Sequence, residues 1–272
     1  MEPHLAESSL PASGPRGSPG TMERRHTTPA IILRAYRIGE IHRGVVMLTP
    51  DEGLVRAIAH GALSQKGKLR GSTVPFTLGE CFLYNDPVRQ SVKITDMRPT
   101  EHHVGLREDI KRFYTASLWT ELILQTYAAG GSTGELFHLF TESLRLLDHG
   151  NGDVADRISI QFLWRFLALA GSRPDLEVCA CSGEALSRDE SIYYTAVEQG
   201  FCSEAFATDA MIRWSAGIAA YMRHTATLDL PPALHVTPPA EAVPRIKRVI
   251  YLLVQELAEM PLHSIRIGSG II

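Results

Sequence analysis

Apolar residues recur at about every second position through much of residues 30–98, which is the spacing of a β-strand with one buried face. Turn residues such as Pro50, Asp51 and Gly53 interrupt these runs. The pattern predicts about five short strands, within AIILRAYR, GVVMLTP, EGLVRAIAHG, FTLGECFLYN and VRQSVKITDM. An open sheet of this size would leave unpaired edges, so we expect the strands to close into a small barrel or sandwich.

Beyond Arg98-Pro99 the spacing of apolar residues becomes helical. Helices are predicted within 109–131, 134–150 and 153–171, and again over about 207–226 and 241–260, the last two separated by the proline-rich LPPALHVTPPAEAVP. The third helix is apolar nearly all round, which is typical of a helix at the centre of a bundle.

These patterns divide the chain into parts of different character. We expect an α+β protein, with a β-domain at 22–100 and a helical domain at 101–272 that carries an irregular, cysteine-containing insert at 172–205. Residues 1–21 are rich in Pro, Gly and Ser and have little to bury, so they are predicted to be disordered. Met22 looks like a natural start of translation.

The composition is that of an ordinary soluble protein, with 44% apolar and 21% charged residues in a chain of 272. No run of apolar residues is long enough for a membrane span, and the N-terminus lacks the apolar core of a signal peptide. Four cysteines are too few and too unevenly spaced for a secreted disulfide scaffold. The expected location is therefore the cytoplasm, with no membrane partner.

Charge is distributed unevenly along the chain. Residues 22–100 contain twelve Lys and Arg against seven Asp and Glu, whereas residues 101–272 contain fourteen against twenty-one. A basic module joined to an acidic remainder suggests a domain that binds a polyanion. Chance patchiness is the alternative.

The basic residues of the predicted β-domain are the strongest direct signal of function. The segment HGALSQKGKLRG, residues 60–71, holds three cations and no acid between two predicted strands. A barrel with a cationic face and an occasional aromatic such as Tyr36 or Phe82 is how OB-type domains follow a sugar–phosphate backbone. The candidate residues for binding such a backbone are Arg34, Arg37, Arg43, Arg56, Lys66, Lys68, Arg70, Arg89 and Lys93, and for each of them a merely solvated position is the alternative.

Four common nucleotide-binding and catalytic motifs are missing from the sequence. It contains no GxxxxGK[ST], GxGxxG, GxSxG or HExxH, and its paired acids fall in turns or loops. No catalytic residue is predicted.

Three cysteines, Cys179, Cys181 and Cys202, have the arrangement of an incomplete zinc site. A structural zinc ion normally takes four ligands from two CxxC knuckles. Here the first pair is CxC, and Ala205 stands where the last cysteine would be. Bound zinc and a metal-free fold with small buried thiols are both compatible with this pattern, and the missing ligand favours the second, so no cofactor is expected.

Several of these motifs together resemble a known family. The run ILRAYRIGEIHRGVVMLTPDEGLVRAIAHGALSQKGKLRGSTVPFTLGECFLY resembles the N-terminal domain of the bacterial RecO family. FLWRFLALAGSRPDLEVCACSGEAL and EQGFC resemble the cysteine-containing part of that family, except that CxC replaces CxxC, Ala205 replaces the last cysteine, and His60 stands where Lys is usual. The resemblance spans about residues 30–270 in element order.

The resemblance implies a five-stranded OB-fold barrel followed by a helical domain with a zinc-finger-like insert. It also implies a non-enzymatic mediator of recombinational DNA repair, which binds single- and double-stranded DNA and anneals complementary strands. The implied protein partners are RecR, the C-terminal tail of the single-stranded-DNA-binding protein SSB, and indirectly RecA. The cations Lys111, Arg112, Arg165 and Arg173 are the predicted site for the acidic tail of SSB, although Arg165 could instead bond a helix end or a buried acid.

Two functions of other classes stay open. A metal-dependent nucleic-acid enzyme would need clustered acids for Mg²⁺, and the acids of the basic domain are scattered singly. A protein–protein scaffold would use the barrel without binding nucleic acid.

Overall fold

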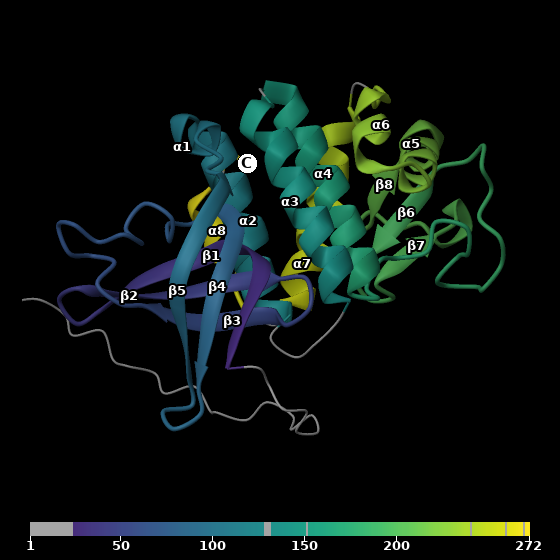
Figure 1. Cartoon of the computed structure of the whole chain (residues 1–272). Helices are drawn as coiled ribbons and strands as arrows, with labels where there is room; N and C mark the ends of the chain where they lie inside the picture. Colours follow the sequence, from purple (N-terminus) through teal and green to yellow (C-terminus); the bar gives the residue numbers. More distant parts are fainter. Residues whose placement is uncertain (1–23, 128–131, 151, 240, 259, 269) are drawn as a thin grey trace, which may run out of the picture.

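The computed structural model describes residues 24–127, 132–150, 152–239, 241–258, 260–268 and 270–272. The predicted disordered segment 1–21 lies outside the described residues. A β-barrel stands at one end of the molecule, a small sheet stands at the other, and helices fill the space between them (Figure 1).

Five strands form the barrel: β1 (Arg25–Ile38), β2 (His42–Thr49), β3 (Gly53–Ala59), β4 (Leu78–Asp86) and β5 (Ser91–Glu101). They close in the order β1-β2-β3-β5-β4, and only the β3–β5 pair is parallel. This confirms the predicted OB-type barrel. Closure removes the strand edges that an open sheet would expose.

The barrel buries residues toward two different cores. Its interior is filled by small and medium apolar side chains, among them Ile32, Val45, Met47 and Leu83. A β-bulge lies between Ile32 and Arg34, which explains why the alternation of the sequence is less regular there. Residues Ile31, Leu33, Leu48, Phe76 and Leu78 point the other way and belong to the core of the helices.

The helical domain is built around α4 (Gly152–Leu169). Its aromatic residues are buried on several sides, and Phe162 stacks on Trp119 of α2 (Ile110–Thr126) with ring centroids 4.3 Å apart. The prediction of a central, all-round apolar helix is confirmed. The helices α3 (Thr133–His149) and α7 (Ala242–Leu257) pack against it together with α2, and the short helix α1 (Gly105–Glu108) packs against α2 and α3.

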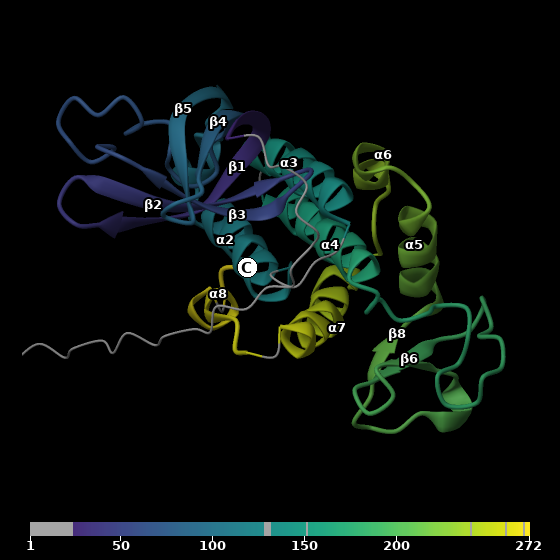
Figure 2. The same cartoon turned by 60° about the horizontal axis from the view of Figure 1, so that its bottom comes forward.

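The chain finishes beside α2, as Figure 2 shows. The short helix α8 (His263–Ile267) begins where the carboxylate of Glu121, on α2, accepts hydrogen bonds from the backbone N–H groups of His263 and Ser264, both 2.8 Å long. A carboxylate at a helix N-terminus satisfies donors that the helix itself leaves free.

The insert is more regular than predicted. Strands β6 (Ile192–Thr195), β7 (Gly200–Cys202) and β8 (Ile212–Trp214) form a sheet in the order β7-β6-β8. The predicted helix over about 207–226 is therefore wrong in its first half, and only α5 (Ala216–Ala226) is helical. The reason is tertiary: pairing of β8 with β6 places Trp214 against Phe201, with ring centroids 4.5 Å apart.

The proline-rich segment also contains a helix that was not predicted. Helix α6 (Leu230–His235) begins with prolines at its first turn, a position where the missing N–H removes no hydrogen bond.

Candidate nucleic-acid interface

The outer face of β1, β2 and β3 carries two rows of side chains set by strand register. Arg34 on β1 pairs with Val46 on β2, which pairs with Arg56 on β3. Residues opposite one another in paired strands share a face, so the two arginines lie on one face of the barrel, two strand spacings or about 10 Å apart. Both side chains are exposed, and within the described chain neither takes part in a hydrogen bond or ion pair.

The second row holds an aromatic ring. Tyr36 on β1 pairs with Gly44 on β2, and Gly44 pairs with Ile58 on β3. The ring of Tyr36 covers Gly44 so closely that a Cβ added there would stand 2.8 Å from the tyrosine hydroxyl oxygen and still nearer to the ring. Tyr36 is nevertheless 43% exposed. Glycine at position 44 thus allows a ring to lie on the sheet between cations.

Two further aromatic rings on the outer face of β4 lie under cations from β5. The Lys93 ammonium is 5.6 Å from the ring centroid of Tyr84, and the Arg98 guanidinium is 4.7 Å from that of Phe82. These distances are those of cation–π contacts. Arg98 and Tyr84 were not among the predicted site residues, because only the cross-strand register brings each pair together.

The basic loop between β3 and β4, residues 60–77, is an ordered part of the barrel. Consecutive turns follow one another along it, and Leu69 and Thr73 are buried. Arg43 holds the loop, because its Nη1 donates to the carbonyl oxygens of Arg70 and Thr73, at 2.9 and 3.2 Å, and to Thr73 Oγ1 at 2.9 Å. Burial, with a smaller contribution from the charge of Arg70, lowers the pKa of Arg43.

The nine predicted cations divide into two groups. The side chains of five are exposed and make no hydrogen bond or ion pair within the described ranges: Arg34, Arg56, Lys66, Arg70 and Arg89. The other four bond to the protein: Arg37 donates to the backbone oxygens of Gly39 and Glu40, Arg43 holds the loop, Lys68 pairs with Asp96 at 2.8 Å, and Lys93 pairs with Asp86 at 2.7 Å.

His60, the first residue of this loop, adds little positive charge at neutral pH. His60 meets His42 edge to face, with ring centroids 4.8 Å apart. Burial lowers the pKa of His60, and the neighbouring His42, Lys93 and Arg89 lower it further. Lys93 lies near the start of the basic loop because β5 pairs with β3 there, with Lys93 opposite Ile58.

The four cations predicted for the helical domain do not form one site. Lys111 pairs with Asp156 at 2.8 Å, and Arg112 donates to the backbone oxygen of Asp148. Arg165 lies nine residues beyond Asp156 on α4, about 14 Å further along the helix. Its terminal nitrogens donate to Gln161 and, at the end of α5, to the backbone oxygens of Thr225 and Leu228, so Arg165 takes the alternative role at a helix end.

Arg173, among these four, lines a cleft with a tryptophan in its wall. The cleft has a volume of about 370 Å³, and Trp164, Arg173, Leu176 and Arg223 are among its lining residues. The Arg173 guanidinium lies 5.9 Å from the ring of Trp164. Arg223 was missed by the sequence analysis. Its Nη1 is buried without a hydrogen-bond partner among the described residues, while its Nε donates to Leu176 O and lies 3.3 Å from Glu177.

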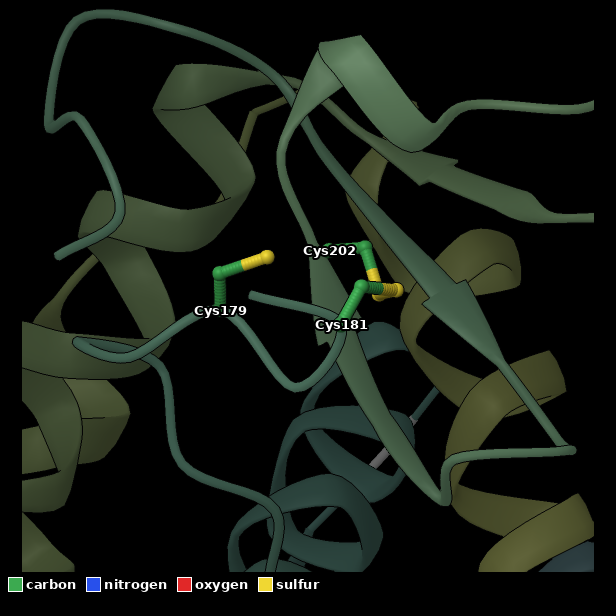
Figure 3. A group of neighbouring side chains, drawn as sticks. All are labelled: Cys179, Cys181 and Cys202. Atoms are coloured by element: carbon green, nitrogen blue, oxygen red, sulfur yellow. A yellow bond between two sulfur atoms is a disulfide. The ribbon is translucent and has the colours of Figure 1, made fainter. Parts of the chain in front are cut away.

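The three cysteines of the insert come together, as Figure 3 shows, and their sulfur atoms lie within 4.8 Å of one another. Cys181 and Cys202 form a disulfide, which the sequence analysis did not predict. Cys179 remains a buried thiol. Burial raises the pKa of this thiol, but hydrogen bonds from Ser182 and from the backbone N–H groups of Ser203, Ser182 and Cys181 outweigh it and bring the pKa to about 7.

This donor set does not fit a structural zinc ion. Zinc in such sites takes four thiolate or imidazole ligands, and a disulfide sulfur is not a thiolate. Within the part of the chain that the structure describes, the cluster contains no fourth histidine, cysteine or acidic residue. The insert is instead held by the disulfide and by the apolar contacts of Trp214 and Phe201.

Comparison with known proteins agrees with this architecture. The family described as Recombination protein O N terminal matches residues 22–102, and Recombination protein O C terminal matches residues 107–266. The chain belongs to the RecO family. Its barrel and its helices correspond to the two named parts of that family.

Relatives named DNA repair protein RecO occur in several bacteria. The chain is 31% identical to that of Synechococcus elongatus over 165 residues, which is 61% of each chain. It is 31% identical to that of Heliobacterium modesticaldum over 168 residues, 62% of this chain and 59% of the relative. It therefore spans about three fifths of the length of the curated relatives it matches. No described helix is both long and apolar enough to cross a membrane.

Proposed function

We propose that this RecO-family protein is a non-enzymatic mediator that binds DNA through the outer face of its barrel. The observation that supports this best is the group of exposed cations with no partner in the described chain, Arg34 and Arg56 on the strands with Lys66 and Arg70 in the ordered loop. Cations of this kind bind phosphates by displacing counterions, without reading sequence. A protein that binds the backbone of two strands in this way can bring complementary strands together for annealing.

Partners other than DNA follow from the same proposal. The cleft beside Trp164 offers the exposed side chain of Arg173 to a carboxylate, next to an apolar wall. These features suit an acidic peptide that ends in apolar residues, such as the tail of SSB. RecR and, indirectly, RecA are the further proposed partners, and the proposed location is the cytoplasm.

The proposal is tested by fluorescence anisotropy with a labelled oligonucleotide at increasing salt concentration. We expect the logarithm of the binding constant to fall linearly with the logarithm of the salt concentration. The magnitude of this slope should decrease by about one to two when Arg34→Glu and Arg56→Glu are combined. Arg188→Glu with Arg248→Glu, two exposed arginines outside the barrel, is the control with the same change of charge.

The rival functions give different outcomes in the same assay. Cleavage of the oligonucleotide on addition of Mg²⁺ would identify a nucleic-acid enzyme. Absence of binding even at low salt would favour a protein–protein scaffold. Equal loss of affinity in the barrel and control variants would show that net charge, and not the barrel face, determines binding.

A further inference from the structure

Tyr36 differs from the other aromatic residues on the outer face of the barrel. The rings of Phe82 and Tyr84 are each covered by a cation of the protein, Arg98 and Lys93. Within the described chain, no cation lies over the ring of Tyr36, and 43% of the residue is exposed. The face of this ring that does not meet Gly44 is therefore free to contact another flat group.

The backbone beneath the ring of Tyr36 has a glycine, which leaves room for the ring to lie against it. Gly44 is the partner of Tyr36 across the β1–β2 pair, and any side chain at position 44 would overlap the ring. The ring is thus supported by β2 and held at a fixed place on the sheet. A rigid aromatic surface is what stacking requires, because little conformational entropy is lost when a second ring is placed on it.

Cations stand beside this ring on the same face. Arg34 lies two residues before Tyr36 on β1, and alternation along a strand puts both side chains on one face. Arg56 belongs to the row of Arg34, and Lys93 of β5 pairs with Ile58 in the row of Tyr36. A base on the ring would therefore have its flanking phosphates near Arg34 and Arg56.

We propose that Tyr36 is a stacking platform for an unpaired base, so that this face of the barrel binds single-stranded DNA more tightly than duplex. The inference rests on the proposed binding of DNA by the barrel. Phosphates are accessible in both forms of DNA, so the arginines contribute to both. The bases of a duplex are stacked on one another, so the ring contributes only where a base is unpaired.

The test compares a labelled oligo(dT) with a duplex of the same length, at one salt concentration, on the full chain. Tyr36→Ala removes the ring, and we expect it to weaken binding of oligo(dT) about tenfold while duplex binding changes less than about threefold. Tyr36→Phe keeps the ring and should keep the affinity. Tyr84→Ala is the matched control, because it removes an aromatic ring of the same barrel face that Lys93 already covers.

Gly44→Ala provides a second, independent variant. This variant keeps the tyrosine at position 36 but displaces its ring, so it should weaken oligo(dT) binding as Tyr36→Ala does. Circular dichroism of both variants checks that they are folded. An unchanged affinity of folded Tyr36→Ala for oligo(dT) would overturn the stacking role. Equal weakening for oligo(dT) and duplex would also overturn it, because the ring would then only shape the surface.

The outcomes separate this inference from the function on which it rests. If Tyr36→Ala has no effect but Arg34→Glu with Arg56→Glu weakens binding, DNA binding by the barrel stands and stacking fails. If the wild-type chain binds neither oligonucleotide at low salt, the proposed function fails and stacking fails with it.

Discussion

Individual cations of the barrel have different tasks although they look alike in the sequence. The side chain of Arg34 is exposed and has no partner in the described chain, whereas the Nη1 of Arg43 donates hydrogen bonds to three oxygen atoms of the basic loop. Without this donor, the carbonyl oxygens of Arg70 and Thr73 would either lack a hydrogen-bond partner or have to bond to water. The conformation of the loop, and the place of Arg70 on it, therefore depends on Arg43.

Replacing Arg43 should affect stability, and replacing Arg34 should not. We expect Arg43→Ala to lower the free energy of unfolding by about 1–3 kcal/mol, because three hydrogen bonds are lost at a partly buried site. Arg34→Ala should change it by less than about 0.5 kcal/mol, as exposed substitutions usually do. Urea denaturation of the two variants measures both values. Similar effects of the two substitutions would contradict the distinction.

The sequence could identify the basic residues as a group but could not separate these roles. Alternation placed Arg34 and Arg56 on strands, and the glycines and lysines of residues 60–71 indicated a loop. The role of Arg43 depends on a loop that begins many residues later and folds back over β2, so no local pattern contains it. The pairs of Lys93 with Tyr84 and Arg98 with Phe82 depend on strand register in the same way.

Among the elements, the insert departs most from its predicted form. Residues 172–205 were expected to be irregular, yet they contribute two strands to a sheet that extends to Trp214. Strands of three or four residues carry too few positions for alternation to show. Their existence follows from pairing with one another and from the burial of Trp214, Phe201 and Tyr194, which are tertiary effects.

The disulfide makes the stability of the insert depend on redox conditions. Cys181 and Cys202 are separated by 21 residues, and a cross-link across such a loop contributes about 3 kcal/mol by restricting the unfolded chain. We expect a Cys181→Ser, Cys202→Ser double variant to melt at a lower temperature than the oxidised wild type, and reduction of the wild type to remove the difference. Thermal melts with and without a phosphine reductant measure it.

Alkylation and elemental analysis are the controls for this interpretation. Denatured, unreduced protein should be alkylated at Cys81 and Cys179 only, as read by mass spectrometry of its peptides. Cys81 is buried inside the barrel and its Ser variant should leave the redox dependence unchanged. One equivalent of zinc per purified chain, together with alkylation of all four cysteines, would contradict the disulfide.

At the scale of the whole molecule, the barrel and the helices share one continuous core. Ile31, Leu33 and Leu48 of the barrel belong to the same cluster as the buried residues of α2, α3 and α4. At the end of this junction Glu101, the last residue of β5, forms an ion pair with Arg145 of α3. The Nε atom of Arg145 lies 2.8 and 2.9 Å from the two carboxylate oxygens, and its Nη2 lies 2.7 Å from one of them. This contact joins the last strand of the barrel directly to the bundle.

The ion pair predicts how the stability of the junction depends on pH. Hydrogen bonding from Arg145 lowers the pKa of Glu101 below its ordinary value of 4.5. Burial opposes this hydrogen bonding less strongly, and the charges of Arg145 and His103 lower the pKa further. A carboxyl group whose pKa is lower in the folded state stabilises the fold above its unfolded pKa, and this contribution disappears as the pH falls through the folded value.

Glu101→Gln should therefore lower Tm by about 2 °C at neutral pH and have little effect near pH 3. Differential scanning calorimetry of wild type and variant across this range measures the difference, with Glu80→Gln, whose partner Arg98 is highly exposed, as the control. A Tm difference that does not change with pH would show that the contact depends on the shape of the side chains and not on their charge.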